Sequence, residues 1–392
     1  MRRGALALVA LLLAACHGGQ EITVTSGAGA AFEPALAVQG NELLLAWHDD
    51  RTRTDQIFLR RYDATLAPLS GELQLTQGTN PAYEADVVFL GERAAVAWYE
   101  AARDGSASVQ VALWDTASGQ QLWQRKLGNA ARSRIPVLAA SGERLFIAWM
   151  EDVDLRPANP PRSSTIWQAW LNADGALLAA PTPLATASPT TWNLNATPFD
   201  AETVALVYDS SHATQAPELY LTLAHAEAPG ATWRLSRDDG IPSTYPDLAV
   251  NGETLALTWF DTVANNSDVS LRLFQKPLLN ENTDSLDVDL EAQAITRTPG
   301  ASIGAYLAWC EDVLGLVLVD DSSGTQQLFL QLFNETGTAL GAMAQLTNSR
   351  TDSTIPAIKG GDRSFLLSWS ESNLNGHATN NGILMLRRVP LP

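Results

Sequence analysis

One short pattern recurs along most of the chain and constrains its fold more than any other feature. An apolar run ends in an aromatic residue, and an acidic residue follows within two positions, as in the segment from Leu43 to Asp49. Trp98 follows Trp47 by 51 residues, and later copies are spaced by 51 or 59. The aromatic place is filled in turn by Trp47, Trp98, Trp149, Tyr208, Trp259, Leu318 and Trp369. Self-similarity at such a period is the signature of a repeat protein, so the chain contains seven copies of one unit.

The sixth copy is the least obvious of the seven. Residues 308–311, which include Trp309, imitate the pattern in the wrong place. We place Leu318 at the aromatic position instead, because residues 328–334 then align without a gap with residues 57–63 of the first copy.

Each copy divides into four short segments with strand character. The first is short and apolar, as at residues 34–38, and a glycine-containing turn follows it. The second is the apolar run, which suits burial on both faces, and the third alternates, as at residues 269–274. The fourth is a segment such as residues 72–76. Four short strands repeated seven times predict an all-β protein, a seven-bladed β-propeller of four-stranded blades.

The two ends of the chain predict that this ring is closed. The last copy stops after its third strand, at residues 383–386, while residues 21–25 align with the fourth strand at 72–76. We therefore expect the N-terminal strand to complete the last blade, which an open solenoid would not need. The two longer repeats place insertions at residues 151–164 and 277–289, and long loops on a rigid ring often carry binding sites.

The first residues resemble the export signal of bacterial lipoproteins. Arg2 and Arg3 precede an apolar run too short to cross a membrane as a helix, and Leu13-Ala14-Ala15-Cys16 is similar to the lipobox of that family. The resemblance implies a signal peptide at 1–15, a lipidated Cys16 with a short tether at 16–20, and one domain at 21–392. His17 stands where inner-membrane lipoproteins usually have Asp, which favours the outer membrane, on either face. An ordinary signal peptide with a chance cysteine is the alternative.

Charge and cysteine content restrict the partners. The formal net charge is −18, and loss of the two signal-peptide arginines makes it −20, which excludes nucleic acid and anionic lipid as favoured ligands. Cys310 is the one cysteine besides Cys16, so we expect no internal disulfide and a fold stabilised by its core. We expect a monomer that contacts the membrane through its lipid and an envelope protein or a glycan through the propeller.

An acidic residue accompanies every copy of the repeat. Six stand two places after the aromatic position, and one stands a single place after it; they are Asp49, Glu100, Glu151, Asp261, Asp320, Glu371 and, in the closer position, Asp209. Because equivalent strand ends share one face of a propeller, these acids predict a candidate binding face for cations or a basic partner. The alternative is that each carboxylate accepts hydrogen bonds within its own turn.

Two groups of propellers share motifs with this chain. Leu346-Thr347, followed by Pro356 at the start of the next blade, is similar to repeats of TolB-type periplasmic propellers. Arg134-Ile135-Pro136 resembles the Arg-Ile-Pro motif of sialidase-like propellers, which implies that Arg134 helps to bind a substrate carboxylate. Arg51, Arg237 and Arg350 are candidates to share its face, and Tyr83, Tyr99 and Tyr245 are candidate nucleophiles.

The sequence departs from true sialidases in several respects. They have six blades and carry the arginine motif in the first, whereas Arg134 opens the third copy. Their Asp-box turns are nearly absent here, with only residues 230–233 keeping the tail of one.

Other chemistry has weaker support. Residues 261–268 are rich in oxygen ligands for calcium but lack the EF-hand spacing, and the five histidines show no zinc pattern. Trp167, Trp170 and Trp192 are candidates for a carbohydrate platform. The leading hypothesis is a non-catalytic binding or scaffold lipoprotein of the bacterial cell envelope with no cofactor. The alternatives are a sialidase-like glycoside hydrolase and a calcium-stabilised propeller.

Overall fold

The computed structural model describes residues 19–25, 29–128, 132–153, 163–187, 191, 193–212, 214–227, 229–279, 292–372 and 382–391. Cys16, His17, Trp192 and most of the two expected insertion loops lie outside these residues. The regular structure within them is β-strand, apart from one 3-10 turn, η1 (Lys276–Leu278). The protein is therefore all-β, as predicted.

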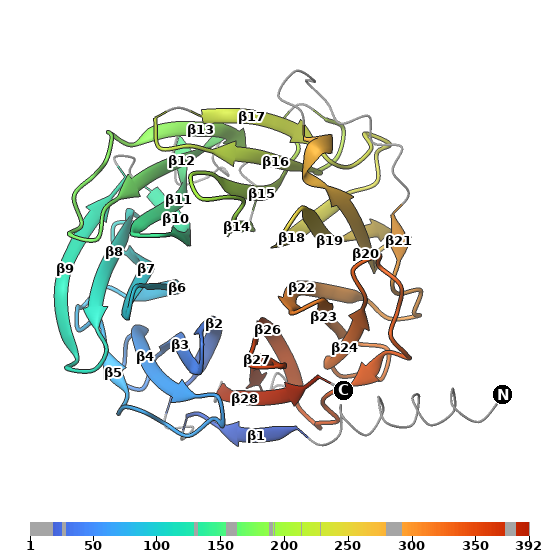
Figure 1. Cartoon of the computed structure of the whole chain (residues 1–392), viewed down its shortest axis with the longest axis horizontal. Coiled ribbons are helices and arrows are strands. Elements are labelled where there is room, and N and C mark those ends of the chain that lie inside the picture. Colours follow the sequence, from blue (N-terminus) through green and yellow to red (C-terminus); the bar gives the residue numbers. More distant parts are fainter. Residues whose placement is uncertain are drawn as a thin grey trace.

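The strands form four-stranded antiparallel blades around a central axis, so the prediction of a propeller is confirmed (Figure 1). Five blades are separate sheets: β2 (Ala31–Gln39), β3 (Glu42–Asp49), β4 (Gln56–Asp63) and β5 (Leu73–Gln74); β14 (Leu194–Pro198), β15 (Val204–Ser210), β16 (Glu218–Ala224) and β17 (Pro229–Arg234); β18 (Ser243–Asn251), β19 (Thr254–Val263), β20 (Asn266–Gln275) and β21 (Gln293–Ala294); β22 (Ser302–Cys310), β23 (Val313–Asp320), β24 (Gln327–Phe333) and β25 (Ala344–Gln345); and β26 (Asp352–Gly361), β27 (Ser364–Ser372), β28 (Ile383–Pro390) and β1 (Gln20–Thr23).

The remaining strands form one eight-stranded sheet. It contains β6 (Ala82–Leu90), β7 (Arg93–Ala101), β8 (Ala107–Asp115), β9 (Gln120–Leu127), β10 (Arg132–Ser141), β11 (Arg144–Val153), β12 (Ser163–Leu171) and β13 (Thr182–Ala187). One parallel pair, Arg132 with Ala107, joins β10 to β8. Seven separate sheets were expected, and five separate four-stranded sheets are seen, because this pair connects two consecutive copies of the repeat.

The N-terminal strand closes the ring as the repeat alignment predicts. β1 pairs with β28, with Gln20 opposite Arg388 and Thr23 opposite Met385. The backbone N–H of Val24 donates to Leu384 O at 2.8 Å, and Val24 is buried. The two ends of the chain thus build one blade, although more than 350 residues separate their sequences.

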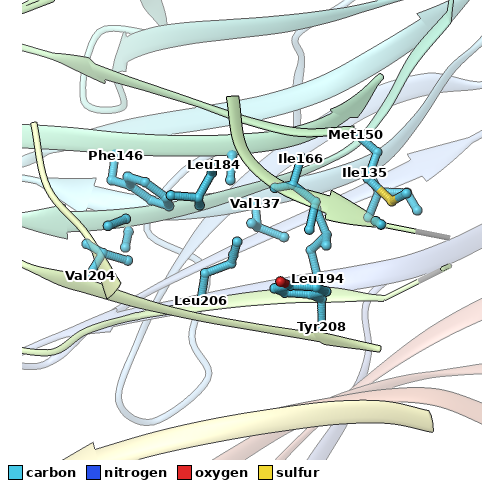
Figure 2. Close-up of a cluster of buried hydrophobic side chains, with 14 of the residues drawn as sticks. Ile135, Val137, Phe146, Met150, Ile166, Leu184, Leu194, Val204, Leu206 and Tyr208 are labelled. Carbon is cyan, nitrogen blue, oxygen red and sulfur yellow. The ribbon is translucent and has the colours of Figure 1, made fainter. Parts of the chain in front are cut away.

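The hydrophobic core lies between neighbouring blades. One cluster combines Phe146 and Ile166 of the β10–β13 half with Val204 and Leu206 of the next blade (Figure 2). Each blade is covered on both faces, so its second strand can be apolar at successive positions. Four repeat tryptophans in those strands are at most 1% exposed: Trp47, Trp98, Trp149 and Trp369. A sheet with one face exposed to solvent would not bury these tryptophans this completely.

The register confirms the placement of the sixth copy. Leu318 lies in the second strand, β23, opposite Phe329, just as Trp47 lies opposite Phe58. Trp309 lies in the first strand, β22, opposite Leu314. The Trp309 stretch therefore imitates the repeat without occupying its aromatic position.

Each blade has two ends that differ in structure. We call the end where the second strand finishes, near Asp49 and its equivalents, the acid end; the opposite end carries the tight turn between the first two strands. Among the described residues, six first strands contain a β-bulge near the acid end. The bulged residues have positive φ and are Glu33, Glu84, Ile135, Tyr245, Gly304 and Ile355. Five of these are not glycine, so the bulge is a strained feature that the surrounding sheet must hold in place.

Candidate functional site

The acids two places after the aromatic position face back into their own blades. A spacing of two puts both side chains on the same side of a strand. The indole N–H of Trp98 donates to Glu100 at 3.1 Å, and that of Trp369 donates to Glu371 at 2.8 Å. Trp149 and Trp259 make the same bond to Glu151 and Asp261. In these four copies the recurring acid is thus a hydrogen-bond acceptor for the recurring tryptophan, whereas the Trp47 indole has no partner among the described residues.

A serine in the first strand supports the same carboxylates. Ser243, Ser302 and Ser353 donate their hydroxyls to Asp261, Asp320 and Glu371 at 2.7–2.8 Å. Asp49 instead accepts from the Arg51 guanidinium and is 1% exposed. Although burial opposes it, hydrogen bonds from Thr298 and Ser322 lower the pKa of Asp320. This geometry favours the structural interpretation of the six acids, while their role as a binding face stays a prediction.

Asp209 departs from the expected ring of acids. Ser210 occupies the position two places after Tyr208, and Asp209 lies on the other side of β15. It accepts the backbone N–H of Tyr245 at 3.0 Å. Burial raises its pKa to about 7, and the Tyr245 hydrogen bond only partly opposes this. The fourth acid therefore faces the neighbouring blade near the axis instead of its own tryptophan position.

Arg134 is buried in an ion pair and is only 3% exposed. Its Nε lies 3.0 Å and its Nη2 3.2 Å from the Asp152 carboxylate, and its Nη1 donates to Thr191 O at 3.1 Å. Arg51 belongs to a different blade, where it contacts Asp49 and Glu72. A substrate carboxylate would have to displace Asp152 to bind Arg134, so the structure does not support the arginine triad that the sialidase resemblance implies.

The other candidates fall into ordinary structural settings. Residues 261–268 form a tight hairpin, in which Asp261 and Asp268 accept hydrogen bonds from protein groups. Within the described residues no group of three or more metal-ligating side chains is found, and the calcium site stays an untested prediction. Trp170 is buried against Phe146, and Trp167 is half-buried. No helix in the described part of the chain is long and apolar enough to cross a membrane.

A different set of residues gathers at the acid end, around the bulges of β2 and β6. We call Glu33, His48, Tyr83, Glu84 and Tyr99 the axial cluster. Glu33 and Glu84 are the bulged residues of neighbouring first strands. His48 and Tyr99 follow Trp47 and Trp98 by one place, so they lie on the opposite side of the second strand from the acids just described.

Short contacts join the members of the axial cluster. His48 Nδ1 lies 3.3 Å from Glu33 Oε2, and His48 Nε2 lies 3.9 Å from Asp55 Oδ1. The His48 ring meets Tyr83 edge-on at 5.5 Å, and Tyr83 lies 5.6 Å from Tyr99. The cluster therefore combines two carboxyl groups, an imidazole and two phenols across the boundary between two blades.

The electrostatics of the cluster are unusual. Burial, reinforced by the charge of Glu33, raises the pKa of Glu84 to about 7. Burial and the nearby Asp55 raise the pKa of Tyr83 to about 12. Perturbed pKa values with a specific charged neighbour are typical of functional sites.

Glu84 Oε2 is a buried oxygen of the cluster with no hydrogen-bond partner among the described residues. Glu33 Oε2 and His48 Nδ1 are also buried, lie 3.3 Å apart and make no other hydrogen bond there. Solvent still reaches this region, because the Glu33 side chain is 35% exposed and Tyr245, near Glu84, is 38% exposed. An unsatisfied polar atom is costly in a folded core, so the axial cluster is the candidate site for a polar ligand.

Sequence reasoning missed Glu33, His48 and Glu84 as functional residues. A signal was present, because Glu33 and Glu84 occupy the same place in successive copies, 51 residues apart. The tyrosines Tyr83 and Tyr99 were named, but as partners of Arg134.

Comparisons with known proteins show the fold alone. No protein-family description and no curated protein matches the chain. The crystal structure of polysaccharide lyase Uly1 matches with a TM-score of 0.58 and 11% identity, covering 95% of this chain and 99% of that one. A protein of unknown function from Dyadobacter fermentans DSM 18053 matches at 0.57 and 8%, covering 95% and 98%.

A third match is the β-propeller domain of the Trilobed protease from Pyrococcus furiosus. It has a TM-score of 0.52 and 8% identity, and the match covers 91% of this chain and 93% of that one. That domain is described as having an open velcro topology, whereas β1 and β28 pair here. At such low identities these proteins share with this chain the architecture of a β-propeller.

Proposed function

We propose that this protein binds a glycan at the axial cluster. The observation that carries the proposal is the buried, unpartnered Glu84 Oε2 together with the Glu33–His48 pair, beside two tyrosine rings. Sugar hydroxyls can donate to the carboxylate oxygens and accept from the imidazole, while the tyrosine rings offer apolar faces. The likeness in fold to a polysaccharide lyase supports a glycan as the class of ligand but does not indicate which sugar binds.

The charge of the site restricts the sugar. Glu33, Glu84 and Asp55 are acidic, and the nearby Arg134 is neutralised by Asp152. A uronic acid would bring a further negative charge into a region of low dielectric, where like-charge repulsion is strong. We therefore propose neutral or amino sugars as the ligand, in place of the acidic sugars expected of a sialidase-like protein.

We further propose the number of blades, the domain bounds and the membrane anchor that the sequence predicts. The eight-stranded sheet divides at its one β8–β10 residue pair into two antiparallel four-stranded halves, which supports seven blades in a single domain of residues 21–392. A lipid on Cys16 would hold this monomeric propeller at the outer membrane. An envelope protein as an additional partner rests on the scaffold hypothesis alone.

Calorimetric titration with oligosaccharides tests the ligand. We expect neutral or amino-sugar oligomers to bind, and uronic-acid oligomers of equal length to bind at least tenfold more weakly. His48→Ala should weaken binding by about tenfold, the effect of losing one to two hydrogen bonds.

Glu92→Gln is the matched control, because Glu92 is exposed at the turn end of the blade that carries Glu84 and its loss should leave affinity unchanged. Preferential binding of uronic-acid oligomers, or unchanged affinity in a folded His48→Ala protein, would contradict the proposal.

A further inference from the structure

The geometry points to a catalytic role for the axial cluster, which rests on the glycan site proposed above. We infer that Glu84 donates a proton to a glycosidic oxygen and that Glu33 accepts a proton from the attacking water, so that the site hydrolyses a neutral or amino-sugar glycoside. None of the seven recurring acids takes part in this chemistry.

The backbone places the two carboxyl groups in equivalent positions of neighbouring blades. Glu33 has φ 53° in β2 and Glu84 has φ 50° in β6, each at the bulge of an innermost strand. A bulge re-aims the side chain relative to its neighbours in the strand. Both residues also lie on strands of a rigid ring, which limits their motion as catalysis requires.

The two carboxyl groups differ in environment. Both side chains are partly buried, but Glu84 Oε2 has no hydrogen-bond partner among the described residues, whereas Glu33 Oε2 lies 3.3 Å from His48 Nδ1. The pKa of Glu84 is raised to about 7 by burial and by the charge of Glu33. A buried carboxyl group with a raised pKa near a second carboxylate is the arrangement that glycoside hydrolysis uses, with one as acid and one as base.

The reaction balances without a further reagent. The Glu84 proton passes to the glycosidic oxygen as its bond to the anomeric carbon breaks. Water adds to that carbon and its proton passes to Glu33. Proton exchange with solvent then restores both groups. His48 is a positioning residue in this scheme, because its Nδ1 lies 3.3 Å from Glu33 Oε2 and can orient that carboxylate.

Substrates with different leaving groups provide the test. The purified protein should release reducing sugar from a neutral or amino-sugar oligomer, with activity falling above pH 7 as Glu84 ionises. Glu84→Gln should lose about 10²- to 10⁴-fold in activity on natural glycosides, the usual contribution of a general acid. The same variant should lose far less on a dinitrophenyl glycoside, whose leaving group needs no proton.

The controls separate this inference from the proposed function. Glu92→Gln should retain full activity, and melting curves show whether Glu84→Gln is folded. Binding without hydrolysis of any neutral or amino-sugar oligomer would overturn the catalytic inference and leave the glycan site standing. Equal losses for Glu84→Gln on natural and dinitrophenyl substrates would also overturn it. Absence of both binding and hydrolysis would remove the two proposals together.

Discussion

At the scale of single residues, one step along a strand decides between structure and function. Asp49 follows Trp47 by two places and faces into its own blade. His48 lies between them and points to the other side of the strand, where it contacts Glu33 and Tyr83 of the axial cluster. Asp209 shows the same effect, since a shift of one place moves its carboxyl group to a neighbouring blade. Sequence reasoning found the conspicuous acids because they recur, and it overlooked His48 because no other copy has histidine there.

The raised pKa of Glu84 makes stability depend on pH. In the unfolded chain a glutamate titrates near 4.5, and in the folded protein burial raises this pKa to about 7. Glu84 therefore does not change the free energy of unfolding at low pH. As the pH rises from about 4.5 to 7, the free energy of unfolding falls, and it stays lower above pH 7. We expect Glu84→Gln to be more stable than the parent at pH 8, by at most about 3 kcal/mol, and nearly equal to it at pH 4.5.

Urea unfolding at the two pH values measures this difference. Glu92→Gln, at an exposed position, should show no such dependence. A Glu84→Gln protein that is less stable than the parent at pH 8 would contradict the assigned cause of the shift.

At the scale of elements, the second strand of several blades contains a repeated hydrogen-bonding arrangement. The tryptophan indole and a first-strand serine both donate to one carboxylate, as Trp369 and Ser353 do to Glu371. The sequence predicts the strand and its burial. It leaves two interpretations of the acid, one as an acceptor of hydrogen bonds within its own blade and one as part of a binding face. It could not choose between them, because the donors come partly from another strand and only the register brings them together.

Removing the acceptor should show how much this arrangement contributes. Glu371→Ala leaves the hydrogen-bonding groups of Trp369, Ser353 and Thr351 without their shared partner. Since each unsatisfied buried group costs about 1–3 kcal/mol, we expect Glu371→Ala to lower the free energy of unfolding by about 3 kcal/mol or more. Glu371→Gln keeps one oxygen that can accept hydrogen bonds, so it should lower the free energy of unfolding clearly less.

Denaturant unfolding with glycan binding as a second readout distinguishes the two roles. A fall in stability with unchanged affinity supports the structural role. A loss of affinity at unchanged stability would instead support the binding face that the sequence suggested.

At the scale of the whole molecule, closure of the ring sets how it would sit on a membrane. Gln20 pairs with Arg388 at the turn end of its blade, opposite to the acid end where the axial cluster lies. Four residues from Cys16 reach at most about 14 Å when extended. A lipid on Cys16 would therefore hold the turn end near the bilayer and leave the axial cluster facing away from it.

Single-cysteine labelling of the lipoprotein in vesicles tests this orientation. Thr52 is exposed at the acid end and Arg363 is exposed at the turn end, while the native Cys310 is buried. We expect a bulky maleimide to label Thr52→Cys faster than Arg363→Cys on vesicles. The two rates should become similar when Cys16→Ala abolishes the anchor and releases the protein. Similar rates on vesicles would contradict the orientation, and membrane retention of Cys16→Ala would contradict the anchor.

The sequence by itself determined the architecture, because a propeller is built from nearly independent copies of one local unit. The apolar period, the turn residues and the alignment of residues 21–25 with 72–76 predict the strands, the register of Leu318 and the closure by β1. The tertiary structure decided the site. Glu33, His48 and Glu84 come together through bulges and through contacts between blades. Those contacts depend on how neighbouring sheets pack around the axis, which no periodicity along the chain records.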